Sequence, residues 1–248
     1  MRNPRIRASF IAKICLASLL GLAVLCSLGC SSSEPTLATA KPGDVITYGQ
    51  YFVDTDDELD DLEWIVLANE DNRLFLLTKD IVLYAPYAYA DDYTEYTDPE
   101  EPWKSSQIRE VLNGNLFYGT AFTEEEQAAI ETLSDDAGEY KVFLPGQSEV
   151  LEYLSEDQYG ATYTPYAESL RSISYEGEDG EIWKAFEDRI GQAWVLRETL
   201  EERPTSVMLI SESGTPISGL NDDDGNHLLS FPIQGHYGIR PVIIVDVP

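Results

Sequence analysis

Two tryptophans, three arginines and one asparagine are the side chains in this sequence best suited to molecular recognition. They are Trp103, Arg109, Asn113, Trp194, Arg197 and Arg240. An indole can stack on a sugar or a peptide, and a guanidinium can pair with an acidic group, so together they would suit a ligand cleft. The same residue types also serve structure, because an arginine can tie strands or loops together through carboxylates and carbonyls beside a buried tryptophan. Both interpretations stay open at the level of sequence, and the structural one is preferred.

Nucleophilic catalysis has little support in this sequence, and we assign no catalytic residue. The Gly-x-Ser-x-Gly motif of serine hydrolases is missing, and all three cysteines fall within the first thirty residues. His227 and His236 are the only histidines that could act as a general base, and both lie beside turn residues. A glycosidase needs two carboxylates at a set separation, but with 45 Asp and Glu residues some pair would meet that separation by chance.

The acidic turn from Asn221 to Asn226 suggests a cation loop by composition but not by register. Calcium takes several oxygen ligands from a tight turn. If Gly225 holds the sixth position of an EF-hand loop, Leu220 and Phe231 fall at the first and twelfth positions, where neither can be a ligand. We therefore predict a solvated turn, no metal site and no cofactor. Calcium held by loops from separate segments stays an open alternative.

The first 42 residues have the pattern of an exported, lipid-anchored protein. Four basic residues and no acid precede an apolar run that is shorter than the roughly 20 residues of a membrane span. Gly29-Cys30 and the serines that follow look like a bacterial lipobox, although Ser27 stands where leucine is favoured. We expect residues 1–29 to be a signal peptide, Cys30 to carry the lipid and residues 30–42 to form a flexible tether. The predicted location is the outer face of the bacterial cell membrane.

The formal net charge of −29 argues against whole classes of partner. Binding to nucleic acid depends on basic residues that displace counterions from phosphates. Electrostatic docking to anionic lipid depends on basic residues as well. We therefore expect no nucleic acid partner, and contact with the membrane through the lipid anchor alone.

The elements that must position the candidate side chains follow from local patterns. Apolar runs at 62–67 and 74–77, separated by Asn69-Glu70-Asp71-Asn72, are typical of a β-hairpin. Ser105-Ser106 can cap a helix that ends at Asn113-Gly114, and Thr123 with Glu126 can form a capping box for another. The other expected elements are strands at 45–48, 142–144, 193–196 and 207–210, a central strand at 239–245, helices at 148–154 and around Phe186, and loops at 54–61 and 84–102.

Antiparallel strands with separate short helices predict an α+β fold for residues 43–248, which we expect to form a single domain. The expected sheet is mixed but mainly antiparallel, and a few short helices accompany it.

Several motifs follow one another along the chain: Gly43–Gly49, Trp103–Arg109 with Leu112-Asn113, Lys141–Leu144, Trp194–Arg197 and Gly238–Pro241. In this order they resemble a bacterial family known as domain of unknown function 6273. The family usually has a serine at the position of Gly146. The resemblance implies a layout similar to C-type-lectin-like folds and to the formylglycine-generating enzyme fold. The copper-binding cysteine pair of that enzyme cannot be present, because no cysteine follows Cys30.

The sequence hypothesis is therefore a surface-tethered, non-catalytic module that binds carbohydrate, cell-wall fragments or another envelope protein. One alternative is an envelope hydrolase or modifying enzyme that uses carboxylates. A second is a structural domain that assembles with a partner chain. Fold alone does not decide among these functions.

Overall fold

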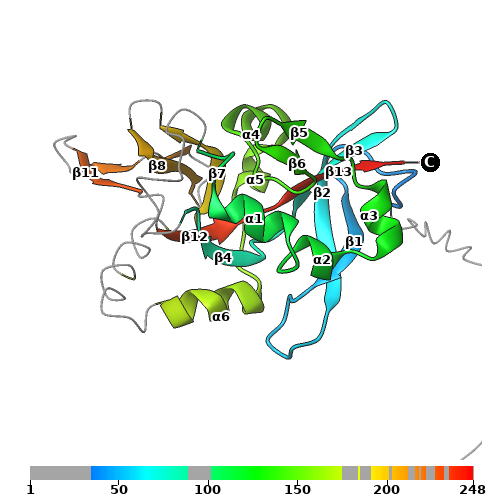
Figure 1. Cartoon of the computed structure of the whole chain (residues 1–248), viewed down its shortest axis with the longest axis horizontal. Helices are drawn as coiled ribbons and strands as arrows, with labels where there is room; N and C mark the ends of the chain where they lie inside the picture. Colours follow the sequence, from blue (N-terminus) through cyan, green and yellow to red (C-terminus); the bar gives the residue numbers. More distant parts are fainter. Residues whose placement is uncertain are drawn as a thin grey trace, which may run out of the picture. The chain divides into compact units, whose positions relative to one another are not determined.

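Two β-sheets form the frame of the fold, and the last two strands of the sequence belong one to each (Figure 1). The computed structural model describes residues 35–88, 102–174, 184, 191–200, 203–211, 216–217, 219–221, 227–231 and 235–247. These residues lie within the unit Glu34–Pro248.

The first sheet has the strand order β1-β2-β3-β13, with every neighbouring pair antiparallel. The turn between β2 and β3 has positive φ at Asp71 (52°) and Asn72 (63°), which suits the right-handed twist of a two-residue hairpin. The predicted hairpin is therefore confirmed. The strand bounds are β1 (Val45–Tyr51), β2 (Asp60–Glu70), β3 (Arg73–Thr78) and β13 (Val242–Asp246).

The second sheet has the order β4-β12-β7-β8-β9, in which only the β12–β7 pairing is parallel. Two small antiparallel pairs, β5–β6 and β10–β11, complete the strands of the described residues. The predicted α+β class with mainly antiparallel sheets is confirmed. The bounds are β4 (Leu83–Pro86), β5 (Leu133–Asp135), β6 (Gly138–Tyr140), β7 (Trp194–Leu200), β8 (Arg203–Ile210), β9 (Pro216–Ile217), β10 (Gly219–Asn221), β11 (His227–Ser230) and β12 (His236–Ile239).

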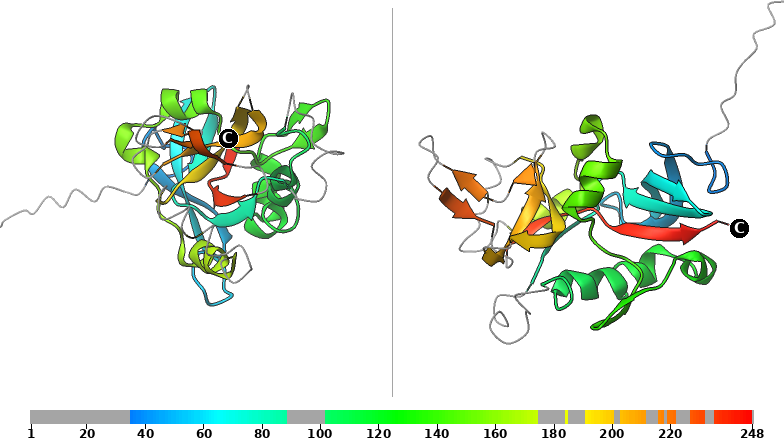
Figure 2. Two further views of the ribbon diagram at one scale, coloured as in Figure 1. Left: turned by 90° about the vertical axis from the view of Figure 1, so that its left-hand side faces the viewer. Right: turned by 90° about the horizontal axis from the view of Figure 1, so that it is seen from above.

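Short helices cover both faces of the first sheet. In Figure 2 (right), α1 to α3 lie on one side of it and α4 on the other. The predicted caps are present: the Ser106 side chain accepts a bond from the Arg109 amide at the start of α1, and Thr123 and Glu126 form the capping box of α3. The bounds are α1 (Gln107–Asn113), α2 (Tyr118–Ala121), α3 (Glu124–Ala129), α4 (Gln147–Tyr153), α5 (Glu156–Tyr159) and α6 (Pro165–Ser174).

The closing apolar run is two strands rather than the single central strand that the sequence predicts. It breaks at Arg240-Pro241, where the chain leaves β12 in the second sheet and enters β13 in the first. Gly238 lies at the β12–β7 pairing, where a Cβ would come within 2.7 Å of the Ala193 carbonyl oxygen. Pro241 lacks an amide hydrogen, but its carbonyl accepts a bond of 3.0 Å from the Thr78 amide. The run is apolar because both of its halves are buried, although they lie in different sheets.

Two further predictions need correction. Residues 142–144 form no regular strand; Phe143 makes only an isolated bridge to Val242, which holds this segment against the outer edge of β13. The predicted surface loop at 84–102 begins inside β4, and Tyr87 and Ala88 after it are buried. Tyrosines in a polar stretch can still face a core when one end of the ring finds a polar partner.

The remaining predictions on elements fall partly outside the described residues. These include most of the helix around Phe186 and residues 222–226 of the acidic turn. Among the described residues, no helix is long and apolar enough to cross a membrane.

Candidate functional site

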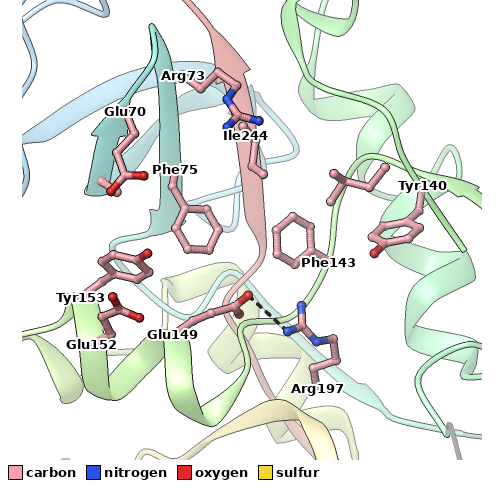
Figure 3. A pocket seen from close by; sticks show the side chains of 12 residues that line it. Glu70, Arg73, Phe75, Tyr140, Phe143, Glu149, Glu152, Tyr153, Arg197 and Ile244 are labelled. Carbon is pink, nitrogen blue, oxygen red and sulfur yellow. Dashed lines mark hydrogen bonds and ion pairs between the residues drawn. The ribbon is translucent and has the colours of Figure 1, made fainter.

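The candidate site is a pocket of about 390 Å³ against the first sheet (Figure 3). Its floor is a row of three side chains, because Ala68 of β2 and Ile244 of β13 both pair with Phe75 of β3. Directly paired residues of neighbouring strands point to the same face of a sheet. The floor therefore exists only when β2, β3 and β13 are in register.

Aromatic rings surround Phe75. The Phe143 ring stacks beside it at 6.0 Å between centroids and an interplanar angle of 17°. The Tyr153 ring of α4 meets it edge-on at 5.6 Å and 85°. Both geometries are favourable for aromatic pairs. The lining is completed by Leu133 and Tyr140 from the β5–β6 hairpin and by the charged residues Glu70, Arg73, Glu149, Glu152 and Arg197.

An ion pair crosses one end of the pocket, as the dashed line in Figure 3 shows. Arg197 Nη2 donates to Glu149 Oε1 at 3.2 Å, and the guanidinium carbon lies 5.7 Å from the centroid of the Phe143 ring. The backbone of Arg197 is fixed on both sides: its amide donates to the Pro145 carbonyl at 3.0 Å, and its carbonyl accepts from the Tyr87 hydroxyl at 2.7 Å. A rigid backbone therefore presents a side chain that is still 27% exposed.

Gly146 is the N-cap residue of α4, at the position where the family that the sequence resembles usually has a serine. Other groups satisfy the amides at the start of this helix. The Gly146 amide donates to Glu149 Oε2, and the next amide, that of Gln147, donates to Glu198 Oε2 at 3.0 Å. Glu198 thus serves the helix terminus in place of a capping side chain. A Cβ at position 146 would collide with the Glu198 carboxylate, so the glycine and this arrangement go together.

Of the other charged residues of the pocket, Arg73 has an ion-pair partner, whereas Glu70 and Glu152 have none among the described residues. Arg73 makes an ion pair with Glu131 at 3.3 Å, outside the lining. Glu70 and Glu152 are exposed and make no ion pair or side-chain hydrogen bond with any described residue. Burial, together with the nearby charges of Glu152, Glu70 and Glu149, raises the pKa of the Tyr153 hydroxyl above its usual value. The α4 end of the pocket is therefore electrically negative.

Of the six predicted recognition residues, only Arg197 lines the pocket. Arg240 and Trp194 lie at the junction of the two sheets and are fully buried. Arg240 donates to the carbonyls of Thr78 (2.9 Å), Lys79 (3.0 Å) and Gln158 (3.3 Å).

Among the described residues, no carboxylate is bonded directly to the buried Arg240 guanidinium at this junction. The Arg240 guanidinium carbon lies 4.8 Å from the centroid of the Trp194 ring, whose Nε1 donates to the Tyr159 carbonyl at 2.9 Å. Burial lowers the pKa of Arg240 to about 9, while the charge of Asp80 acts in the opposite direction. The guanidinium therefore stays protonated at neutral pH and ties the two sheets together.

Trp103 and Arg109 are structural residues behind the pocket wall. Trp103 is buried, and its carbonyl accepts from the hydroxyl of Ser106, the cap of α1. Arg109 makes a two-pronged bond to Asp135 (2.9 and 3.0 Å) and lies 4.6 Å from the centroid of the Tyr140 ring. Burial of the Asp135 carboxyl acts to raise its pKa, but the bonds from Arg109 prevail and lower it. Arg109 thereby holds the β5–β6 hairpin, which carries Tyr140, against α1.

Asn113 positions a pocket residue without entering the pocket. Its Oδ1 accepts from the amides of Lys141 (2.7 Å) and Val142 (2.9 Å). Its Nδ2 donates to the carbonyls of Val142 (2.8 Å) and Arg109 (2.9 Å). All polar positions of the amide are used, so the segment just before Phe143 is fixed.

Sequence reasoning missed most of the pocket, in particular Phe75, Phe143 and Tyr153. The floor depends on the register of non-adjacent strands, which no local pattern reports. One usable signal was present: Glu149, Glu152 and Tyr153 recur at i, i+3 and i+4 in the predicted helix 148–154, and this spacing places them on one helix face.

Other candidates lie elsewhere or outside the described residues. His236 stacks against Tyr84 at 5.8 Å and does not line the pocket, and the side chain of His227 is not described. Cys30 also lies outside the described residues. In the part of the chain that the structure describes, no three His, Cys, Asp or Glu side chains are grouped so as to hold a metal ion.

Comparison with known proteins identifies a family for this chain. No curated protein and no solved structure matches this chain, so the lectin-like layout stays a prediction. The model of one family, described as a domain of unknown function (DUF6273), matches residues 71–247. This span begins at the β2–β3 turn and includes α4, β7, β12 and β13, and therefore most of the pocket lining. The match covers well over half of the sequence, and the chain belongs to the DUF6273 family.

Proposed function

We propose that this protein is a lipid-anchored, extracytoplasmic binding module and that the pocket over Phe75 receives its ligand. The observation that carries the proposal is the pocket itself: an aromatic floor and walls, with charged groups at both ends. Ligand sites commonly combine an apolar lining with a few placed polar groups, and a volume of this size suits part of a glycan or peptide. The signal peptide, Cys30 and the tether would place the domain outside the cell membrane.

Binding without catalysis is the better account of the carboxylates in this pocket. Both oxygens of Glu149 are engaged, one by Arg197 and the other by the Gly146 amide. Glu70 and Glu152 are exposed to solvent. Hydrolysis by a carboxylate pair needs one acid kept protonated by an apolar environment, facing a second across the substrate. The three glutamates favour recognition of a ligand over cleavage of one.

The anchor predicts a specific mature N-terminus. Intact-mass and peptide mass spectrometry of the protein from its native membrane should find chains that begin at Cys30 with a covalent lipid. Replacement of Cys30 with serine should release the protein from the membrane fraction. A chain that retains Met1 and the apolar leader, or an unmodified Cys30, would contradict this part of the proposal.

Filling the pocket should weaken ligand binding strongly while the fold is kept. Ala68 contributes the smallest side chain of the floor, so Ala68→Leu projects a larger group over Phe75. We expect the change in unfolding free energy to stay within about 1 kcal/mol, because the added carbons enter open space rather than a packed core. Binding to any ligand found on a glycan, muropeptide and peptide array should weaken at least about tenfold.

The matched control is Ala128→Leu, an equal enlargement at an exposed position of α3 that does not line the pocket. It should bind as the natural sequence does. Equal binding by the natural chain and Ala68→Leu would show that the ligand site lies elsewhere. No retention of the natural chain on any array surface would argue against a binding module.

A further inference from the structure

The ionic groups of the pocket leave a net negative charge. Two arginines line it, and each is already paired with a glutamate: Arg197 with Glu149, and Arg73 with Glu131. Glu70 and Glu152 line it as well and have no such partner among the described residues. After pairing, two carboxylates are left over and no guanidinium. Electrostatic complementarity therefore favours a ligand with a positive group.

The unpaired carboxylates lie beside the aromatic corner. Figure 3 shows Glu152 and Tyr153 on consecutive positions of α4, Glu70 across from them on β2, and Phe75 between these elements and the opposite wall. Aromatic faces attract cations, and carboxylates add a longer-range attraction at the rim. An aliphatic chain can at the same time bury its methylene groups against the same rings.

A metal ion suits this arrangement poorly. Calcium needs six or more oxygen ligands at short distances from one point. Within the described ranges no three acidic or histidine side chains are grouped to do this, and Figure 3 shows Glu70 across the Tyr153 ring from Glu152. An organic cation on an apolar stem matches both the unpaired carboxylates and the aromatic rings of the lining.

We propose that the pocket recognises an alkylammonium group, as at the end of a lysine side chain in a peptide. The aliphatic stem lies over Phe75 and Ile244, and the ammonium lies between Glu70 and Glu152. The Tyr153 hydroxyl, which makes no hydrogen bond with a described residue, is available as an acceptor. This inference rests on the proposed binding function and adds the chemical class of the ligand.

The test uses three pentapeptides that differ at one position. The central residue is lysine, Nε-acetyl-lysine or norleucine, flanked by Gly and Ala with blocked ends, so that charge and stem length are varied separately. Each is titrated into the full chain in neutral detergent, followed by calorimetry and by the ¹³C methyl signals of Ile244. The lysine peptide should perturb Ile244 and bind at least about tenfold more tightly than the two neutral peptides. Its affinity should fall with added salt.

Substitutions that remove single negative charges test which carboxylates bind the lysine peptide. Glu70→Gln with Glu152→Gln should weaken binding of the lysine peptide about tenfold or more. The control is Glu58→Gln with Glu110→Gln, two exposed glutamates that do not line the pocket, which changes the total charge equally. The control should leave affinity unchanged within about twofold. An equal loss in both pairs would assign the effect to overall charge and overturn the site.

The two proposals fail in different ways. Suppose a neutral peptide or a glycan binds as tightly as the lysine peptide, perturbs Ile244 and is blocked by Ala68→Leu. The alkylammonium proposal would then be wrong, and the pocket would still be the ligand site. If the lysine peptide does not bind, the alkylammonium proposal is wrong as well. If in addition no ligand from the array binds in the pocket, the proposed binding function is wrong too.

Discussion

Replacement of Arg240 with methionine is expected to lower the free energy of unfolding by about 4 kcal/mol or more. Methionine can fill much of the space beside Trp194 but cannot donate hydrogen bonds. The carbonyls of Thr78, Lys79 and Gln158 would lose their donors inside the protein. Each buried acceptor left without a partner costs about 1–3 kcal/mol, and backbone carbonyls cannot be removed to compensate.

Guanidinium chloride unfolding of the purified chain, followed by tryptophan fluorescence, measures the effect. Arg197→Met is the matched control, because that side chain is partly exposed and makes one side-chain hydrogen bond, of 3.2 Å, to the described residues. The control should lose less than about 1 kcal/mol. Similar losses for the two variants would mean that Arg240 is not the tie between the sheets.

A second large loss of folding stability is expected in alkaline solution. The hydroxyls of Tyr48, Tyr51 and Tyr87 donate to the carbonyls of Glu126, Leu116 and Arg197 at 2.7–2.8 Å. Burial raises the pKa of all three phenols above the usual 10.0. Since the folded pKa exceeds the unfolded one, their stabilisation is complete below about pH 10 and is lost as the pH rises further.

The size of the alkaline effect follows from the number of phenols. Each contributes about 1.4 kcal/mol per pH unit above the unfolded pKa, so two units would remove roughly 8 kcal/mol. That is comparable with the whole stability of a typical domain. Arg240 works in the opposite direction, because its folded pKa is lowered to about 9 and its unfolded value is higher. As one group against three, it reduces the net loss over these two units to roughly 6 kcal/mol.

The measurement is a pH titration from neutral to strongly alkaline, with circular dichroism and near-ultraviolet phenolate absorbance recorded together. The phenolate signal of the buried rings should appear with the loss of structure and not before it. Tyr87→Phe should reduce the slope of stability against pH above pH 10 by about 1.4 kcal/mol per unit. Ionisation of these rings while the circular dichroism stays native would contradict the prediction.

Local chemistry made part of the fold predictable. The β2–β3 hairpin, the Ser106 cap and the capping box at Thr123 each depend on residues within a few positions of one another, and all three are present. The helix predicted at 148–154 matches α4 within a residue at each end. Signals of this kind need no knowledge of what lies on the other side of the core.

The other parts of the fold and the site depend on pairing between distant segments, which local sequence patterns do not report. The apolar run at 239–245 was predicted as one strand. Hydrophobicity does not report that Arg240 bonds to the carbonyls of Thr78 and Lys79, at the end of β3, while Gly238 pairs with Trp194. The motif arginines could not be separated by sequence into structural and pocket-lining ones. The difference lies in their partners among the described residues: Arg109 makes four side-chain hydrogen bonds and Arg240 makes three, whereas Arg197 makes one.

The division of the closing segment between the sheets also constrains how the molecule is made. A ribosome delivers β3 long before β13, yet Ile244 must lie beside Phe75 to complete the pocket floor. Until β13 emerges, β3 has one unpaired edge and the pocket floor lacks Ile244. Closing such a distant pairing is slow. The pocket floor is therefore completed only after β13 has been synthesised.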